Sequence, residues 1–285
     1  MADNMVKRSS FLENEVVDLA EEIKLVSPTD TPLTTMLMAR GLVEKATDIT
    51  VTWRERELNT NRGTLNNVCQ IIEKVTQVSG TARALKPKGL GDVFDAEVQD
   101  RLIETKRDLE WYFLNGTKTQ ESDNTPRQMA GLMNLVNEAN VVTTAGALKE
   151  DHILDALQKM WDKGAQGEYF AFVNASQKRA INALAKAEGN VRWVIDNGSV
   201  ANKYGIAVSQ IVTDFGTVNI VLDRYMDNNG ILIVDLDEVR IAELRGTFYE
   251  DLPKAGDYHK GHIINESSIK LLNSYAGAKI LVTAG

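Results

Sequence analysis

Three histidines are the side chains of this sequence best suited to proton transfer or to binding a transition metal. His152 falls on the exposed face of an expected helix, and His259 and His262 form an H-x-x-H pair near the carboxyl end. A closed metal site needs three or four ligands at fixed spacings, and this pair supplies only two of them. We therefore interpret His259 and His262 as solvated loop residues and expect no metal ion.

Acidic side chains gather in the string VDLDE, between two apolar runs. Asp235, Asp237 and Glu238 could bind a cation through their oxygens. Turn chemistry explains the same residues, because Asp side chains bond to the backbone two positions further on. We favour the turn and keep the cation site as the alternative. Asp223 and Asp227, with the N-N-G that follows them, are interpreted as turn residues as well.

The motifs of known catalytic and nucleotide-binding sites are absent from the sequence: G-x-x-x-x-G-K-[ST], G-x-G-x-x-G after a strand, G-x-S-x-G and H-E-x-x-H. The expectation is a protein that is not an enzyme and has no cofactor. Cys69, the single cysteine, cannot form an internal disulfide and is interpreted as a small, half-buried hydrophobe.

The composition is that of a folded protein, with 43% hydrophobic and 25% charged residues. A formal net charge of -8 argues against a surface that grips nucleic acid, because neutralising phosphates takes clustered Lys and Arg. The amino terminus has no apolar run after its basic pair, and no run of about 18 apolar residues occurs elsewhere. We expect a soluble, cytoplasmic protein with no membrane partner.

The elements that must position these residues begin with short pieces. Apolar periodicity predicts an amphipathic helix at 15–25, and the prolines of SPTDTP end it. Asp30 or Thr31 is predicted to cap a second short helix that ends at Gly41.

A strand-like, charged stretch follows, centred on TWRERELNTNRGTLN. Its alternation directs Val51 and Trp53 to one face and Thr52, Arg54 and Arg56 to the other. Two strands of a dozen or more residues would form a hairpin roughly 40 to 50 Å long, at about 3.3 Å per residue. Because an isolated hairpin is marginal in water, this one must lie on another, polar surface.

The strongest helix signal covers residues 92–114, with Asp92 as N-cap and Asn115-Gly116 as the stop. Beyond it, helices and strands mix between about 145 and 245, which predicts an α/β unit with a mixed sheet. The last 25 or so residues predict one long strand and a shorter one. Chain order therefore suggests that the mixed unit is inserted into a region that the carboxyl terminus completes.

Two terminal strings resemble the major capsid proteins of tailed bacteriophages, whose shell fold is shared with herpesvirus capsids and encapsulin nanocompartments. VVDLAEEIKLVSPTDTPLTTML is similar to an amino-terminal segment of that family with a D-I-x-x-x-x-P-x-x-T-P string. KGHIINESSIKLLNSYAGAKI is similar to the family's closing segment, with its N-x-x-A-G/H-x-K-I order. The order of the predicted elements agrees over almost the whole chain.

The resemblance implies an α+β fold of the tailed-phage major capsid type. It has an N-arm, an extended β-hairpin loop, a peripheral domain with a long spine helix, and an inserted α/β axial domain. The implied boundaries are 1–45 for the N-arm, 46–85 for the extended loop, 86–145 with 246–285 for the peripheral domain, and 146–245 for the axial domain.

The implied function is structural: a capsid protein of the virion that self-assembles as pentamers and hexamers into an icosahedral head. Its partners would be copies of itself, scaffold, portal and decoration proteins, and enclosed double-stranded DNA held without sequence-specific binding. Assembly would take place in the cytoplasm of the bacterial host. Two alternatives remain open, namely an encapsulin-like nanocompartment shell and an α/β enzyme whose flap is the hairpin.

Within this resemblance the hairpin is expected to contact a neighbouring subunit. The expected contact residues are Trp53, Arg54, Glu55, Arg56, Glu57 and Arg62. Some members of the family link a lysine of the extended loop to a neighbour's asparagine. Lys74 is the one lysine between 46 and 85, and no motif assigns it a partner, so the sequence leaves a crosslink at Lys74 open.

Overall fold

The computed structural model describes residues 5–6, 30–56, 62–85, 92–165, 167–188, 193–195 and 208–283. The chain divides into two compact units. The first unit takes residues 1–30, 71–109 and 245–267, and the second takes 31–70, 110–244 and 268–285. The chain passes between the units at five points, and four of them (70/71, 109/110, 244/245 and 267/268) fall inside a helix or a strand. Each of those four elements therefore contributes residues to both units. The helix expected at 15–25 lies outside the described residues.

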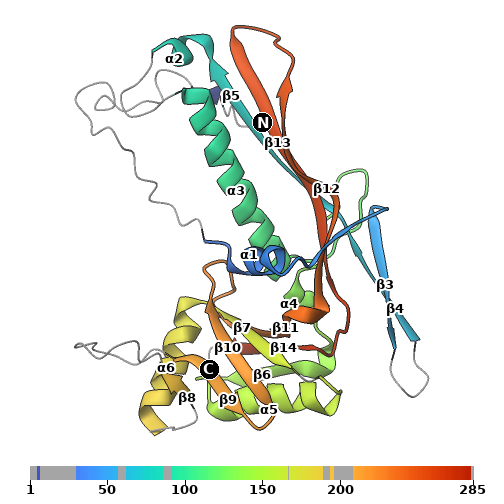
Figure 1. Cartoon of the computed structure of the whole chain (residues 1–285), viewed down its shortest axis with the longest axis vertical. Coiled ribbons are helices and arrows are strands. Elements are labelled where there is room, and N and C mark those ends of the chain that lie inside the picture. Colours follow the sequence, from blue (N-terminus) through green and yellow to red (C-terminus); the bar gives the residue numbers. More distant parts are fainter. Residues whose placement is uncertain are drawn as a thin grey trace. The chain divides into compact units, whose positions relative to one another are not determined.

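Helices and strands follow one another along the whole chain (Figure 1). In chain order they are β1 (Met5–Val6), α1 (Pro32–Ala39), β2 (Val43–Lys45), β3 (Thr50–Arg56), β4 (Arg62–Val68), β5 (Gln70–Ser79), α2 (Gly80–Ala84), α3 (Val93–Asn115), α4 (Leu132–Leu135), η3 (Glu138–Asn140), β6 (Val141–Ala145), α5 (Glu150–Asp162), β7 (Glu168–Val173), α6 (Ala175–Glu188), β8 (Trp193–Ile195), β9 (Val208–Thr213), β10 (Gly216–Leu222), β11 (Gly230–Asp235), η4 (Leu236–Glu238), β12 (Val239–Leu252), β13 (Tyr258–Leu271) and β14 (Gly277–Thr283).

The first unit contains the start of the long helix α3. Asp92 caps it as predicted, since its Oδ1 accepts a hydrogen bond from the Phe94 N–H at 2.9 Å. The Asp92 Oδ2 also pairs with the Arg83 guanidinium at 2.6 Å. Val93 and Phe94 then pack on Val78 of β5, which joins the helix to the strand.

The second unit contains a seven-stranded sheet in the order β6-β14-β11-β7-β10-β9-β8. It is mixed, as predicted: β10 runs parallel to β7, and β6 runs parallel to β14, whereas β11 runs antiparallel to both of its neighbours. β6 and β14 come from outside residues 146–245. The boundaries predicted at 145 and 246 therefore do not coincide with the edges of this sheet, and the division into peripheral and axial domains stays a prediction.

One apolar core covers a face of this sheet. Alternate residues of β7, including Tyr169 and Val173, share it with Leu157 of α5 and Ile181 of α6. Phe170 and Phe172 point to the opposite face and are buried there too. Burial on both faces accounts for the uninterrupted apolar run of β7.

The hairpin is shorter than predicted. β3 and β4 pair over seven residues each, or about 23 Å of strand. After Val68 the chain leaves β3, and β5 joins a different sheet, ordered β1-β5-β13-β12-β2. The alternation of residue types continues through this change of partner, which is why the sequence pattern did not locate it.

The short helix α1 ends where predicted, with Arg40 as C-cap and Gly41 at a φ of 69°. It also begins where predicted, with Thr31 in the N-cap position, but Thr31 makes no side-chain capping bond. The cap comes instead from Glu110 of α3, which accepts hydrogen bonds from the Leu33 and Thr34 N–H groups.

Within the described parts of the chain, no helix combines the length and the apolar character needed to cross a bilayer. Those same parts hold no group of three or more His, Cys, Asp or Glu side chains arranged to bind a metal ion.

Candidate functional site

β3 and β4 form a two-stranded hairpin (Figure 1), and its two faces differ in burial. Residues that lie directly opposite each other in an antiparallel pair share a face. Trp53 pairs with Leu65 on one face, and Arg54 pairs with Thr64 on the other. The first face is the one that the rest of the second unit covers.

Trp53 fixes the base of the hairpin to the same chain. Its side chain is 8% exposed, and its indole Nε1–H donates to the Leu271 carbonyl at 2.8 Å. Val51 beside it packs with Cys69 and Ala242 in a small core. Cys69 is 0% exposed. We predicted a half-buried side chain, so its burial was underestimated.

Asn67 ties the hairpin to two further segments. Its Nδ2 donates to the carbonyls of Ala130, at 2.9 Å, and Ile269, at 2.8 Å. Its Oδ1 accepts from the N–H groups of Ala130, at 2.8 Å, and Val68, at 3.0 Å. A fully buried amide with both ends satisfied orients the strand strongly. Sequence reasoning missed Asn67, since its neighbour Asn66 is exposed and nothing in the sequence separates the two.

Glu55 also binds within the chain. Its Oε1 accepts from the Ser274 N–H at 3.0 Å and from the Ser274 hydroxyl at 2.9 Å. Lys118 reaches β4 from another loop and donates to the Asn66 carbonyl at 2.8 Å. These bonds account for Glu55 inside the subunit.

The opposite face of the hairpin is open. Thr52, Arg54, Thr64 and Asn66 are exposed there. No ion pair joins Arg54 to another residue that the structure describes. The backbone register places Arg56 opposite Arg62, and Glu57 lies outside the described residues. Of the six predicted contact residues, Arg54 is therefore the one with a described, exposed side chain.

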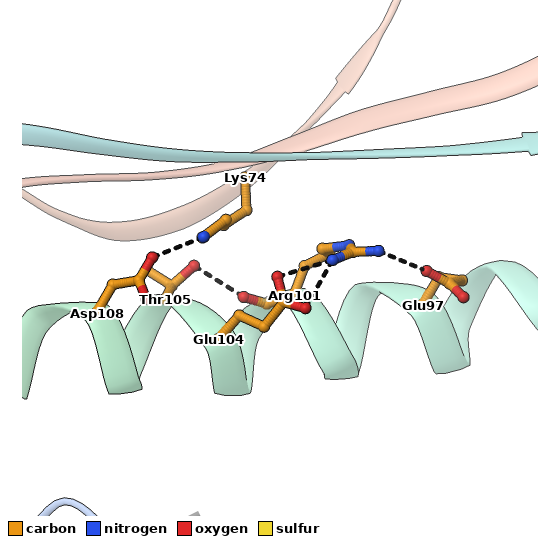
Figure 2. Close-up of polar contacts among 6 residues, drawn as sticks. All are labelled: Lys74, Glu97, Arg101, Glu104, Thr105 and Asp108. Atoms are coloured by element: carbon orange, nitrogen blue, oxygen red, sulfur yellow. Dashed lines mark hydrogen bonds and ion pairs between the residues drawn. The ribbon is translucent and has the colours of Figure 1, made fainter. Parts of the chain in front are cut away.

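A second polar group lies in the first unit, between β5 and the long helix. Lys74 of β5 forms an ion pair with Asp108 of α3, with 2.6 Å between Nζ and Oδ2 (Figure 2). The two side chains point toward each other from neighbouring elements. The amine that we considered for a crosslink is thus paired with a carboxylate of its own chain.

Arg101 organises the next turns of α3 (Figure 2). Its Nη1 lies 2.7 Å from the Glu104 carboxylate, and its Nη2 lies 3.4 Å from Glu97. Burial is the largest single influence and opposes the charge of Arg101, but the hydrogen bond to Glu104 and the nearby carboxylate charges together raise the Arg101 pKa. Burial raises the pKa of Glu97. Arg101, Glu97 and Glu104 thus pair with one another along one face of α3. Such pairs stabilise a helix and indicate a structural role.

A protein-family model described as SU10 major capsid protein matches residues 5–284. The chain belongs to this family. It is a shell protein of phage capsids, located in the virion, and it associates with copies of itself. No curated protein matches the chain.

Solved structures share the fold of this capsid protein. The capsid of cyanophage A-1(L) has a TM-score of 0.68 at 12% identity, covering 96% of this chain and 98% of the other. The holo-SrpI encapsulin of Synechococcus elongatus PCC 7942 has a TM-score of 0.63 at 14% identity, covering 91% of each chain. The capsid of a native GTA particle has a TM-score of 0.62 at 13% identity, covering 94% and 95%. The predicted α+β fold of the tailed-phage capsid type is confirmed.

Two histidines of the capsid protein differ from their prediction. His259 and His262 lie on strand β13 rather than in a loop. The His262 Nδ1 is 2.7 Å from Glu73 of β5, and its Nε2 is 3.6 Å from Glu250 of β12. His259 contacts the ring of Phe94. Three strands must assemble before these partners meet, so local sequence did not indicate them.

The acidic string of the capsid protein forms a turn, as favoured. Asp235 caps the short helix η4 by accepting from the Asp237 N–H at 2.9 Å, and Asp237 pairs with Arg40 at 3.1 Å. His152 accepts a hydrogen bond from the Lys149 N–H at 3.1 Å. Asp235 therefore stabilises the start of η4, and His152 stabilises the start of α5.

A cavity of about 400 Å³ opens elsewhere in the second unit. It is lined by Trp111, Asn115, Asn174, Arg224, Tyr225, Met226, Asp227 and Asn228. The amides of Asn115 and Asn174 donate to the carbonyls of Tyr225 and Met226, so they shape the loop that forms the wall. The lining of this cavity includes none of Asp235, Asp237 and His152, the residues that an active site of the enzyme alternative would use.

Proposed function

We propose that this capsid protein assembles as pentamers and hexamers into an icosahedral phage head enclosing double-stranded DNA, and that the open face of its hairpin contacts a neighbouring subunit. The supporting observation is the asymmetry of the hairpin. Trp53, Glu55 and Asn67 hold one face to the subunit, and Arg54 lies exposed on the other.

The chemistry of the open face suits reversible assembly. Exposed ion pairs are each worth roughly 0 to 1 kcal/mol, so one contact between subunits is weak. Many weak contacts repeated around a shell correct misplaced subunits before the particle closes. DNA is enclosed without a specific grip, in keeping with the net charge of -8. Scaffold, portal and decoration proteins complete the head in the cytoplasm of the bacterial host, and the chain acts structurally rather than as an enzyme.

The test is assembly of the purified chain, followed by electron microscopy and light scattering over a concentration series. Closed particles or capsomers support the proposal. A monomer that persists at the highest concentration, with and without a co-expressed scaffold, contradicts it.

An encapsulin-like compartment is the second candidate, favoured by the likeness to the SrpI encapsulin. Particles isolated from the native host separate the two functions. Nuclease-resistant DNA of uniform length supports the phage head, whereas a stoichiometric cargo protein without DNA supports the compartment.

A further inference from the structure

Two carboxyl groups meet in the interior of the second unit. Glu110 lies on α3, and Asp223 follows the end of β10; both side chains are 0% exposed. Helix α3 adjoins the segment after β10, where the Asn115 amide donates to the Tyr225 carbonyl at 2.7 Å. The two carboxyl groups lie close enough for the charge of Asp223 to raise the pKa of Glu110. Two ionised carboxylates cannot share such a contact away from water, because like charges and the loss of hydration both oppose it.

The Glu110 carboxyl also holds the first turn of α1. Its Oε1 accepts from the Leu33 N–H at 2.5 Å, and its Oε2 accepts from the Thr34 N–H at 2.8 Å and from the Thr34 hydroxyl. The first N–H groups of a helix have no partners within the helix. Because Thr31 makes no capping bond, Glu110 supplies the cap of α1 from another element.

Asp223 shows where a proton must lie. Its Oδ1 accepts from the Tyr225 N–H at 2.8 Å. Its Oδ2 is buried, and no N–H or side-chain hydroxyl group of the described residues donates to it. A buried acceptor without a donor is costly, and a proton on the neighbouring Glu110 carboxyl provides the missing donor.

The surroundings favour that protonated state. Burial raises the pKa of Glu110 to about 8, and the charge of Asp223 raises it further, although the bonds from Thr34 oppose the shift. Burial also raises the pKa of Asp223. The packed helix α1, with the sequence PLTTMLMA, brings no charged side chain to the pair. Among the described residues, Asp223 is thus the charged group that acts on the Glu110 carboxyl.

We propose that Glu110 and Asp223 share one proton and act as a latch, which holds the start of α1 while the proton is present and releases it when the proton is lost. α1 lies within the segment predicted to be the N-arm. The latch would let a rise in pH free the root of that arm. The inference concerns the single subunit and does not depend on the proposed assembly.

The direction of the pH effect follows from proton linkage. The pKa of Glu110 is raised from 4.5 to about 8 in the folded chain. Folded protein therefore binds a proton that unfolded chain has lost between these values. The stability that the latch contributes is fully present below 4.5 and declines as the pH rises to about 8. Above that value the ionised pair repels and the hold on α1 fails.

Hydrogen exchange of the α1 peptide, measured by mass spectrometry on the unassembled full-length chain, tests the latch. Exchange is recorded from about pH 6 to pH 9.5 and expressed as protection relative to an unstructured peptide. We expect wild-type protection to fall by up to about tenfold per pH unit as the pH rises toward about 8, because the opened chain has lost a proton that the folded chain still holds. Above about pH 8 both states have lost it, and protection should level off at its low value.

Two variants should lose this step. Glu110→Gln carries no proton to release, so its protection stays level with pH. In Asp223→Asn the amide donates to an ionised Glu110, so α1 stays protected at alkaline pH. Asp237→Asn is the matched control, since that carboxylate pairs with Arg40 at the other end of α1 and is 77% exposed. It should follow the wild type.

Three results would overturn the proposal. The first is wild-type protection that stays level to about pH 9.5, and the second is a step that persists in Glu110→Gln or, should that variant not fold, in Asp223→Asn. The third concerns a cation: alkaline wild-type protein that regains protection with millimolar Mg²⁺ or Ca²⁺, in a Glu110-dependent way, would assign the pair to a metal ion instead of a proton.

Discussion

Asn67 is the residue that joins most segments at the hairpin. Its buried amide bonds to Ala130, Ile269 and Val68 through four hydrogen bonds. Removing the Asn67 amide leaves the buried backbone groups of Ala130, Ile269 and Val68 without these hydrogen-bond partners. The cost of such orphaned groups exceeds the value of the bonds themselves.

Asn67→Ala should lower the free energy of unfolding by about 3 kcal/mol, because buried backbone groups lose their partners. Urea denaturation measures the change. Asn66→Ala is the matched control: the same residue type, next in sequence but exposed, should change stability by less than about 0.5 kcal/mol. Equal losses in both variants would show that Asn67 has no special role.

The Asp92–Arg83 pair gives a prediction about acid. The hydrogen bond to Arg83 lowers the pKa of Asp92 below its usual 3.8, and the Phe94 N–H adds to the effect. A lowered pKa contributes stability that is present above 3.8 and is lost as the pH falls through the folded value.

Asp92→Asn keeps the helix cap and removes the charge. We expect it to lower stability by roughly 0.5 kcal/mol at neutral pH, the size of a partly exposed pair. The difference from wild type should vanish at about pH 2, as thermal unfolding across a pH series will show. A stability difference between Asp92→Asn and wild type that is the same at all pH values would mean that the charge of Asp92 does not cause it.

Residue-scale prediction from sequence succeeded where the partner is local. Asp92 was identified as a cap because its acceptor and donor are two residues apart in the chain. The cap of α1 was not, because Glu110 lies 76 residues beyond Thr34. The same distance problem hid the partners of His262, which sit on two other strands.

At the scale of elements, the end of α3 depends on two glycines. The Gly131 N–H donates to the Gly116 carbonyl at 2.8 Å. A Cβ on Gly131 would lie 2.6 Å from the Gly116 nitrogen and 2.6 Å from the Leu114 backbone. Backbone atoms cannot move aside as a flexible side chain can, so the two segments meet only where side chains are absent.

Gly131→Ala should therefore destabilise the protein by about 3 kcal/mol or more, as overpacking against a fixed backbone does. Gly63→Ala provides the comparison, because a Cβ there meets nothing within 4 Å and the position has no positive φ. Thermal unfolding of both variants distinguishes the sites. A well-tolerated alanine at 131 would contradict this close approach.

The elements themselves were largely predictable. Periodicity and end signals located α3, the strands around Phe215, and the final pair β13 and β14. The hairpin was overestimated, since alternation marks a strand without naming its partner. The sequence around Val68 and Gln70 resembles one continuous strand. In the structure β4 ends at Val68, β5 begins at Gln70, and the two strands belong to different sheets.

At the scale of the whole molecule, the resemblance of two terminal strings carried the fold prediction further than composition did. Composition excluded classes of protein but selected none. The family match over residues 5–284 agrees with the fold and the shell function. The contact residues predicted on the hairpin stay a prediction, because a single subunit does not show which surface a neighbour covers.

Charge reversal on the hairpin tests whether its open face joins subunits. Particle yield is measured by electron microscopy and light scattering for wild type, Arg54→Glu/Arg56→Glu, and the charge-conserving control Arg54→Lys/Arg56→Lys. Reversing the charges should replace attraction to the neighbouring subunit by repulsion. A loss of about 1.4 kcal/mol of association free energy per contact between subunits should raise the concentration needed for assembly about tenfold. We expect few or no particles from the reversed variant, with unchanged thermal unfolding, and normal particles from the control. Normal particles from a folded reversed variant would contradict it.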